Sequence, residues 1–350
     1  MKEKMRAGIL HKPGLITCEL ISKPEAGEGE VLVAVKKAGI CGSDIPRFLK
    51  GVPRYNFKIL GHEFVGEVVE VGRGVNSVEV GERVAVNPDL PCGKCPMCRV
   101  GEYALCEHFT RMGTRTDGGF AEYLRVPAGN LLKLPASVDY ETGAMLEPAA
   151  TALHTVKRGG VFPGDIAVVM GCGCIGCLIA QELNILGARQ VYVIDIVEAK
   201  LKIAAQVGLR NLIDVKQVDP VEKILKETAG RGADVVFESA GSVKTVNQSI
   251  KLARRLGRIA LLGLINEEVT LSADAYSDII RHELNLRGVF GNDYKPFPSS
   301  GWETALDYLA TGKLKVKPLI THHYPIEEID QAFQEMSQYR DRFNKVLIEF

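Results

Sequence analysis

The chain has 350 residues, a length that favours two domains over one. Lys and Arg together number 43, as do Asp and Glu, so the formal net charge is zero and electrostatics gives no reason to expect a nucleic-acid or membrane partner. Hydrophobic residues make up 46% and charged residues 25%, which excludes a disordered or fibrous chain.

The nine cysteines are an odd number, and the first residues lack the apolar run of a signal peptide. We therefore expect reduced thiols in the cytoplasm rather than a disulfide framework. The most apolar stretch, residues 166–180, contains three glycines and is too short to span a bilayer, so no transmembrane segment is predicted.

The chain shows two successive sequence patterns. Residues 1 to about 150 contain β-branched runs ended by Gly or Pro, at 31–39, 64–72 and 81–88, which predict a many-stranded β domain. The next part predicts strands at 166–170, 191–195, 233–238 and 258–263, with helices at 174–187, 198–208 and 244–257 between them. This alternation predicts a doubly wound parallel sheet, and the last sixty residues add a helix at 302–314, a strand at 316–325 and a helix at 326–340.

Gly171, Gly173 and Gly176 have the G-x-G-x-x-G spacing, between a predicted buried strand and a predicted helix. Such glycines allow a tight turn and bring a pyrophosphate close to the backbone at the positive end of the helix. Asp195 ends the next strand, where its carboxylate would bind the ribose hydroxyls and repel a 2′-phosphate, so NAD is favoured over NADP. The alternatives are a turn that binds nothing or a different nucleotide.

Three cysteines, Cys172, Cys174 and Cys177, lie inside this turn. As metal ligands they would compete with the pyrophosphate for the same loop. We interpret them as small packing residues.

Four further cysteines, Cys92, Cys95, Cys98 and Cys106, lie within fifteen residues, with Gly and Pro between them. Four thiolates at this spacing can surround a tetrahedral metal, and zinc suits four sulfurs best. An iron–sulfur cluster would use similar ligands. We predict a structural zinc, closed to substrate because the protein fills all four positions.

A second set of possible ligands is spread along the chain: Cys41, His62, Glu63 and Glu147. A thiolate, an imidazole and a carboxylate would leave a fourth position for an alcohol oxygen, as a catalytic zinc requires. Spacing alone does not connect these residues, and a histidine beside a glutamate is more often a structural pair.

The motifs together resemble the zinc-dependent medium-chain alcohol and polyol dehydrogenase family. The similarity rests on GICGSD (39–44), LGHEF (60–64), the four-cysteine segment, DGGFAEY (117–123), the glycine motif and PLIT (318–321), in family order. The resemblance implies an α/β chain with a GroES-like catalytic domain, residues 1–150 and 287–350, that holds two zinc sites. It implies an NAD-binding Rossmann domain over residues 151–286.

The resemblance also implies roles for single residues. Cys41 and His62 become ligands of the catalytic zinc, with Glu63 and Glu147 as the carboxylates near the metal. Ser43 matches the hydroxyl that takes the substrate's proton. One position departs from the family pattern: where many members carry a proton-relaying histidine, this chain has Pro46, which has no titratable group.

The implied activity is hydride transfer from a secondary alcohol of a polyol phosphate, such as galactitol 1-phosphate, to NAD, giving a ketose phosphate. Arg47 and Arg115 are candidates to bind the phosphate, and Asn292 to touch substrate hydroxyls. A solvated basic loop and buried packing are the alternative interpretations of these residues. The alternative activities are oxidation of a neutral polyol, a sugar acid or L-threonine, and a non-catalytic NAD-binding protein is the alternative of another class. The family usually forms homodimers or homotetramers.

Overall fold

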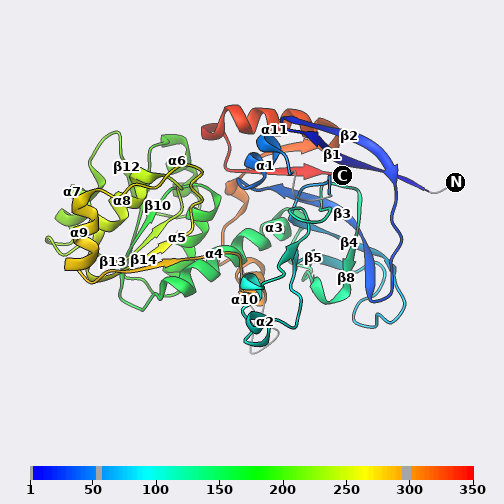
Figure 1. The fold of residues 1–350 in the computed structure, drawn as a ribbon, viewed down its shortest axis with the longest axis horizontal. Helices are drawn as coiled ribbons and strands as arrows, with labels where there is room; N and C mark the ends of the chain where they lie inside the picture. The colour runs from blue at the N-terminus through cyan, green and yellow to red at the C-terminus, as the bar shows by residue number, and fades with distance from the viewer. Residues whose placement is uncertain (1–2, 53–56, 294–300) are drawn as a thin grey trace. The chain divides into compact units, whose positions relative to one another are not determined.

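The computed structural model describes residues 3–52, 57–293 and 301–350, and the chain divides into two compact units (Figure 1). The first unit contains residues 1–147, 293–312 and 320–350, and the second contains residues 148–292 and 313–319. The segment Lys313–Leu319, which our domain boundaries assign to the catalytic part, groups with the second unit. The side chain of Gln181 explains this grouping, because its amide donates a hydrogen bond to the carbonyl oxygen of Lys315 and accepts one from the backbone N–H of Lys315.

The first unit is built on a seven-stranded sheet in the order β16-β17-β3-β4-β5-β9, with β8 also paired to β3. Its strands are β3 (Glu30–Ile40), β4 (Glu63–Val71), β5 (Arg83–Val86), β8 (Tyr123–Pro127), β9 (Leu131–Lys133), β16 (Ile320–Pro325) and β17 (Lys345–Glu349). The three predicted β-branched runs form β3, β4 and β5. All neighbours are antiparallel except β16 and β17.

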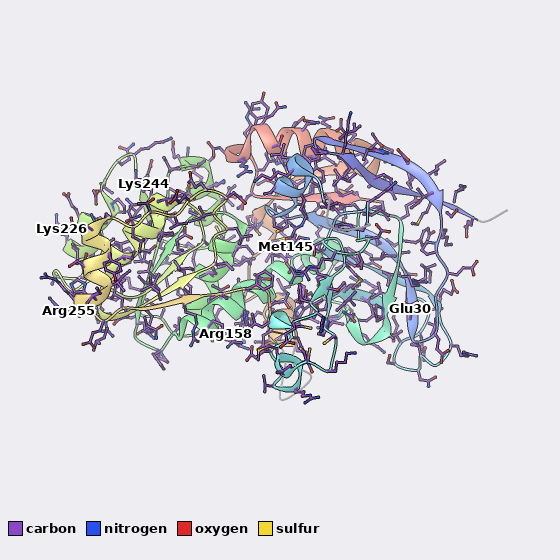
Figure 2. The ribbon with its side chains drawn as sticks, in the orientation of Figure 1. Glu30, Met145, Arg158, Lys226, Lys244 and Arg255 are labelled. Atoms are coloured by element: carbon purple, nitrogen blue, oxygen red, sulfur yellow. The ribbon has the colours of Figure 1, made fainter. Side chains whose placement is uncertain are left out.

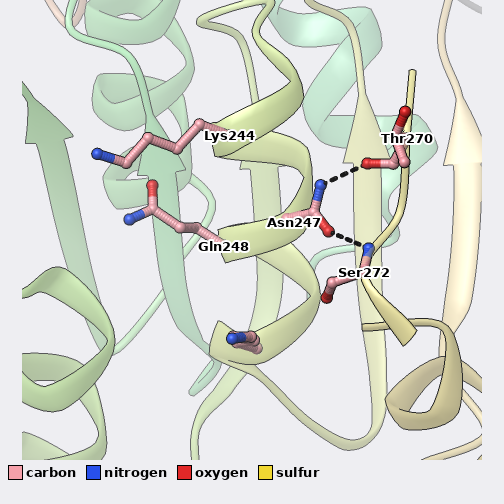
Figure 3. Close-up of a pocket in the computed structure, with 6 residues that line it drawn as sticks. Lys244, Asn247, Gln248, Thr270 and Ser272 are labelled. Carbon is pink, nitrogen blue, oxygen red and sulfur yellow. Dashed lines mark hydrogen bonds between the residues drawn. The ribbon is translucent and has the colours of Figure 1, made fainter. Parts of the chain in front are cut away.

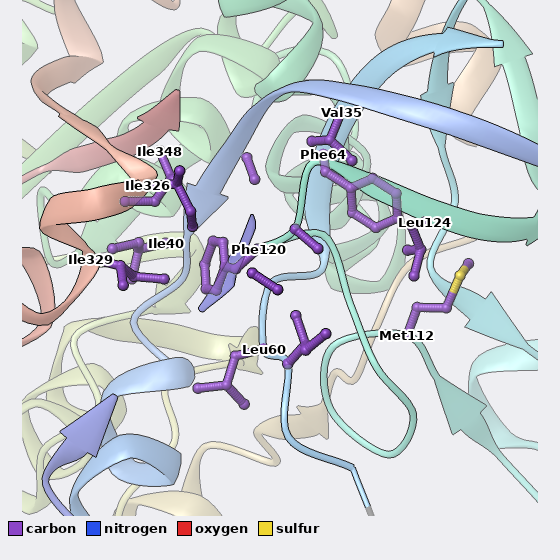
Figure 4. Close-up of a cluster of buried hydrophobic side chains, with 14 of the residues drawn as sticks. Val35, Ile40, Leu60, Phe64, Met112, Phe120, Leu124, Ile326, Ile329 and Ile348 are labelled. Atoms are coloured by element: carbon purple, nitrogen blue, oxygen red, sulfur yellow. The ribbon is translucent and has the colours of Figure 1, made fainter. Parts of the chain in front are cut away.

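Two smaller strand pairs accompany this sheet, β1 (Lys4–Lys12) with β2 (Leu15–Ser22) and β6 (Asp89–Leu90) with β7 (Thr110–Arg111). The helices are α1 (Asp44–Lys50), α2 (Pro96–Arg99), α3 (Tyr140–Ala144), α10 (Gly301–Ala310) and α11 (Ile329–Gln338), and α4 (Leu146–Gly159) crosses into the second unit. Aromatic and branched side chains such as Phe64, Phe120 and Ile348 form the core (Figure 4). Segments from both ends of the chain contribute to it, since Ile348 belongs to the last strand.

The second unit contains a six-stranded parallel sheet in the order β12-β11-β10-β13-β14-β15. Its strands are β10 (Ile166–Met170), β11 (Gln190–Asp195), β12 (Asn211–Asp214), β13 (Ala233–Glu238), β14 (Ala253–Leu261) and β15 (Asn285–Gly288). Its helices are α5 (Cys174–Ile185), α6 (Glu198–Gln206), α7 (Pro220–Glu227), α8 (Val243–Leu252) and α9 (Ala273–Arg281). The strand order reverses between β10 and β13, the switch point at which such sheets bind nucleotides.

Several predicted bounds differ from the observed ones, and two of these differences have a clear cause. The helix predicted over 244–257 ends at Leu252, because Ala253 already pairs with Ala233 in the sheet. Leu256 then takes a left-handed backbone (φ 58°), which a helix cannot continue. The strand predicted over 316–325 begins only at Ile320, after a 3₁₀ turn over Lys317–Leu319.

Figure 2 shows the side chains of Lys226, Lys244 and Arg255 on the outside of the second unit, where all three are exposed. Met145 in the first unit is fully buried. Of the helices in the described part of the chain, none is long and apolar enough to cross a membrane.

Glu182, on α5, is an unusual core residue because its carboxyl group is fully buried and neither oxygen has a hydrogen-bond partner among the described residues. Burial raises the pKa of this carboxyl well above its ordinary value, against the charge of Lys157. The folded state therefore holds a proton that the unfolded state releases at about pH 4.3. The contribution of this bound proton to the free energy of unfolding is complete below the pKa of the unfolded state. It is lost as the pH rises through the pKa of the folded state.

We expect Glu182→Gln, which stays neutral at every pH, to be more stable than the parent at pH 8, by about 1–3 kcal/mol. The difference should shrink toward pH 5. Urea unfolding followed by circular dichroism at both pH values measures it, with the exposed Glu198→Gln as the matched control. An equal difference at the two pH values would contradict the buried-proton interpretation.

Candidate catalytic and cofactor sites

The four cysteines of the segment 92–106 gather in one lobe. The ligand atoms of Cys92, Cys95, Cys98 and Cys106 all lie within 4.8 Å of one another. The backbone N–H of Cys98 donates to Cys95 Sγ, and such donors lower the pKa of Cys95 to about 6, whereas burial raises that of Cys98 to about 12. A closed set of four sulfurs fits a tetrahedral, soft metal such as zinc.

The second ligand cluster forms where β3 ends and β4 begins. Gly39 on β3 is the register partner of Glu63 on β4, so Cys41, just after β3, comes close to His62 and Glu63. The ligand atoms of these three residues lie within 4.8 Å of one another, and His62 and Glu63 are only 2% and 1% exposed. The antiparallel register thus joins residues that spacing alone could not connect.

Asp44, which the sequence analysis did not single out, orients the histidine. It is fully buried, accepts a hydrogen bond from the backbone N–H of Cys41 at 3.1 Å, and places Oδ1 3.4 Å from His62 Nδ1. Although burial opposes it, the charge of Asp44 raises the pKa of His62 well above its ordinary value. A carboxylate behind Nδ1 leaves Nε2 as the nitrogen to bind a metal.

Lys345 is a second residue that the sequence did not reveal. It lies on β17, 282 residues after Glu63, is 3% exposed, and forms a buried ion pair with the Glu63 carboxylate. No local pattern marks it, because only the pairing of β17 with β3 brings the last strand to this place.

Glu147 lies outside the three-residue cluster, beside a partly buried arginine. Its Oε1 is 3.5 Å from Arg111 Nη1, and Arg111 also donates to Asp89. Burial raises the pKa of Glu147, while the charges of Arg111 and His62 oppose that rise. Of the four residues predicted to surround the catalytic metal, the structure therefore groups three closely and leaves Glu147 next to a cation.

The charges of this site test whether a metal fits it. In the forms that bind a metal, Cys41 as a thiolate and His62 as a neutral imidazole, the described groups provide five negative charges and three positive ones. The acidic groups are Cys41, Asp44, Glu63, Asp89 and Glu147, and the cations are Arg47, Arg111 and Lys345. Two negative charges remain uncompensated in a largely buried site, and a divalent cation would neutralise them.

Ser43 lies next to the thiol. Its hydroxyl donates to Cys41 Sγ at 3.3 Å and accepts from Arg47 Nη1 at 3.0 Å. Ser43 is the N-cap of α1, and Pro46 lies in the first turn of this helix. The missing N–H of Pro46 costs no helical hydrogen bond there. The serine thus stands between the candidate ligand and a guanidinium.

The other candidate substrate residues are placed differently. Arg115 is exposed and donates to the carbonyl of Phe109, whose ring lies 5.5 Å from the guanidinium. Asn292 lies in the second unit and is 2% exposed. Arg47 contacts Ser43, a residue of the predicted catalytic set.

A hollow of about 430 Å³ on the second unit does not belong to these sites (Figure 3). It lies along α8, where the Asn247 side chain donates to Thr270 O and accepts from Ser272 N. Lys244 projects from the same helix into solvent. This hydrogen-bonded clamp fixes the chain before α9 and contains none of the predicted cofactor residues.

The glycine motif forms a tight turn between β10 and α5. Gly171 has φ 98°, and a Cβ on Gly176 would lie 1.9 Å from the Gly171 carbonyl oxygen. A Cβ on Gly173 would meet nothing within 4 Å, so open space lies before the N-terminus of α5. An anion can occupy such a space against unpaired helix N–H groups.

Asp195 lies beside this turn. Its Oδ2 accepts from the backbone N–H of Cys172 at 2.6 Å and its Oδ1 from that of Val197 at 2.8 Å. Cys172, Cys174 and Cys177 are all buried, with 3.6 Å between Cys172 Sγ and Cys177 Sγ, as expected for packing residues.

We expect Asp195→Ala to raise the KM for NAD about ten- to a hundredfold, because a charged acceptor for the ribose hydroxyls is removed. The NADP activity should fall less or rise, because the repulsion of the 2′-phosphate disappears. Initial rates with both cofactors measure this, with Asp214→Ala at the end of β12 as the control. An unchanged ratio of the two efficiencies would contradict the assigned role of Asp195.

Comparisons with known proteins agree with this geometry. Family models described as "Alcohol dehydrogenase GroES-like domain" and "Zinc-binding dehydrogenase" match residues 27–136 and 174–311. L-Threonine 3-dehydrogenase of Bacillus licheniformis is 36% identical over 345 residues, 96% of each chain. Sorbitol dehydrogenase of Halalkalibacterium halodurans is 37% identical over 326 residues, 92% of this chain and 93% of its own. The chain belongs to the zinc-dependent medium-chain alcohol dehydrogenases.

Solved structures lead to the same family. Galactitol-1-phosphate dehydrogenase from Escherichia coli superimposes with a TM-score of 0.91 at 33% identity, over 99% of this chain and all of that one. A zinc-binding dehydrogenase from Sinorhizobium meliloti bound to NADP has a TM-score of 0.91 at 32% identity, over the whole of both chains. An alcohol dehydrogenase from Escherichia coli complexed with NADH has a TM-score of 0.89 at 30% identity, over 99% of both.

The predicted fold class and family are therefore confirmed. The chain is an oxidoreductase of a zinc- and nicotinamide-dependent family, so the alternative of a non-catalytic binding protein falls away.

Proposed function

We propose that this dehydrogenase oxidises a secondary alcohol of a polyol phosphate of the galactitol 1-phosphate kind to a ketose phosphate, with NAD as the hydride acceptor. The observation that carries the proposal is Arg47. Its guanidinium is partly exposed and bonded to Ser43, so a permanent cation lies directly beside the proposed proton acceptor. One guanidinium group can donate hydrogen bonds to two phosphate oxygens at once. Arg47 is therefore suited to bind the charged end of such a substrate.

Cys41 and His62 would hold the catalytic zinc, with Glu63 as the carboxylate of the same cluster and Glu147 beside Arg111. Zinc at this place supplies Lewis-acid chemistry, which favours loss of the proton from an alcohol oxygen. The chain's own contribution is Ser43, whose hydroxyl can take that proton as it passes its own proton on to solvent. Arg47 cannot take the proton onward, because a guanidinium stays charged, but its hydrogen bond stabilises negative charge on Ser43 Oγ. With Pro46 in the relay position, the proton leaves by a route that does not pass through that side chain.

The remaining assignments belong to the same proposal. Asp195 supports NAD rather than NADP, and Gly171, Gly173 and Gly176 would receive its pyrophosphate. Cys92, Cys95, Cys98 and Cys106 would hold a second, structural zinc. The nine free cysteines support a reducing compartment, for which we propose the cytoplasm.

A homodimer or homotetramer is also part of the proposal. Strand β15 ends the order of the parallel sheet, and apolar side chains of the same unit are exposed by half or more. They include Leu264, Tyr276, Ile280 and Phe290. A strand at the edge of a sheet, with exposed apolar side chains nearby, is suited to contact a second copy of the chain. Sedimentation velocity measures the mass of the assembly directly.

The substrate is tested by comparing kcat/KM for galactitol 1-phosphate, galactitol, sorbitol and L-threonine at fixed NAD. We expect the phosphate ester to exceed the neutral polyols at least about tenfold, and Arg47→Met to remove that advantage while Lys50→Met, on the same helix, keeps it. Equal efficiencies for galactitol and its phosphate would overturn the phosphate assignment. A neutral polyol is the second candidate, favoured by the 37% identity to a sorbitol dehydrogenase.

A further inference from the structure

Arg111 carries more contacts with the catalytic region than any role assigned so far requires. It lies on β7 as the register partner of Asp89 on β6, and its Nε donates to the Asp89 carboxylate. Its Nη1 lies 3.5 Å from Glu147 Oε1. Asp89 is 2% exposed and Glu147 is 6% exposed, so two buried carboxylates share this guanidinium.

The position of Arg111 is fixed from several sides. Its guanidinium lies 5.7 Å from the centre of the Phe109 ring. Asn130 donates to the carbonyl oxygens of Asn87 and Asp89, at 2.8 and 2.7 Å, and so holds the partner strand. Asp89 in turn accepts from Arg111, which therefore has little freedom to follow Glu147 if that carboxylate moves.

The two strands that carry this ion pair enclose the four-cysteine lobe. Strand β6 ends just before Cys92, and β7 begins shortly after Cys106. The lobe is thus a long loop between Asp89 and Arg111. A metal bound by the four cysteines would cross-link this loop and hold its two ends together.

We infer that Arg111 is a positioning residue that keeps the Glu147 carboxylate directed toward its guanidinium and away from the metal ligands Cys41, His62 and Glu63. The fourth ligand position is then left to the substrate oxygen. Without Arg111, the Glu147 carboxylate loses this ion pair and can move to become a fourth protein ligand, and a catalytic site with four protein ligands is closed. The inference rests on the catalytic metal of the proposed function, but not on the identity of the substrate.

The test measures metal binding rather than turnover. Cobalt replaces zinc at the catalytic site while zinc remains in the lobe, and visible absorption with a competing chelator gives the Co²⁺ affinity. We expect Arg111→Met to bind Co²⁺ about tenfold more tightly, because a nearby positive charge is lost and a carboxylate is released. The double variant Arg111→Met with Glu147→Gln should lose this gain, and Arg111→Lys should stay within about twofold of the parent.

Two results would overturn the inference. One is an Arg111→Met protein whose Co²⁺ affinity and absorption bands equal those of the parent, and the other is a double variant that retains the full gain. If the Arg111→Met protein does not fold, the Glu147→Gln variant alone tests the inference. Its Co²⁺ absorption bands, which report the ligands of the metal, should match those of the parent, and altered bands would show that Glu147 already ligates the metal. Because no substrate enters these measurements, failure of the polyol phosphate assignment would leave them unaffected.

Discussion

Cys41→Ala is expected to lower kcat by about ten-thousandfold or more and to reduce the zinc content from two ions per chain to one. The thiolate is the soft ligand of the proposed catalytic metal, and no other described cysteine lies in that cluster to replace it. Loss of the metal removes several kcal/mol of stabilisation of the negative charge that develops on the substrate oxygen. Metal analysis by mass spectrometry and initial-rate measurements test the two effects separately.

Cys18→Ser is the matched control, because Cys18 is a free, partly buried cysteine on β2 that belongs to neither predicted zinc cluster. It should keep two zinc ions and full turnover. NAD binding, followed by nucleotide fluorescence, should be unchanged in both variants, since the glycine turn lies in the second unit. A fully active Cys41→Ala protein would disprove the metal assignment.

The second large effect is on stability. Cys98→Ser removes one of four sulfurs in a lobe whose other clustered apolar side chains are Phe109, Met97 and Tyr103. Zinc bound by four thiolates supplies folding free energy directly, so its loss should lower the melting temperature of the first unit by about 10 °C. Differential scanning calorimetry with and without NAD distinguishes the units, because NAD should shift only the transition of the second.

The lobe variant also has a clear contrary outcome. A Cys98→Ser protein that retains two zinc ions and the parent's melting temperature would show that the four cysteines are not a structural metal site. Cys18→Ser again serves as the control, with no expected change in either quantity.

The sequence was sufficient for the parts of the fold that depend on local patterns. Strand β10, the glycine turn and α5 follow each other within 20 residues, so buried runs and glycine spacing predict them together. The bound of α8 was predicted wrongly, because residues 253–257 read as a helix, whereas Ala253 already pairs with β13 and the pairing resumes at Arg258. Strand pairing overrides helix propensity there.

The candidate catalytic site was predictable only in part, for a similar reason. Cys41 and His62 lie in recognisable motifs, whereas Lys345 and Arg111 are single basic residues in short strands and have no pattern around them. Each acquires its role from a strand partner, β3 for Lys345 and β6 for Arg111. Their importance lies in charge compensation within a buried site, which appears only once the acidic groups have been brought together.

The position of β17 has a consequence for synthesis of the protein. This strand lies between β16 and β3 in the larger sheet, yet in chain order it follows every other strand and helix of the described residues. Most of the second unit, residues 148–292, is continuous and can fold while translation continues. The first unit stays incomplete until β17 has been made, with one edge of β3 uncovered and Glu63 lacking Lys345. A nascent chain should therefore bind the proposed nucleotide before it can bind the proposed catalytic metal.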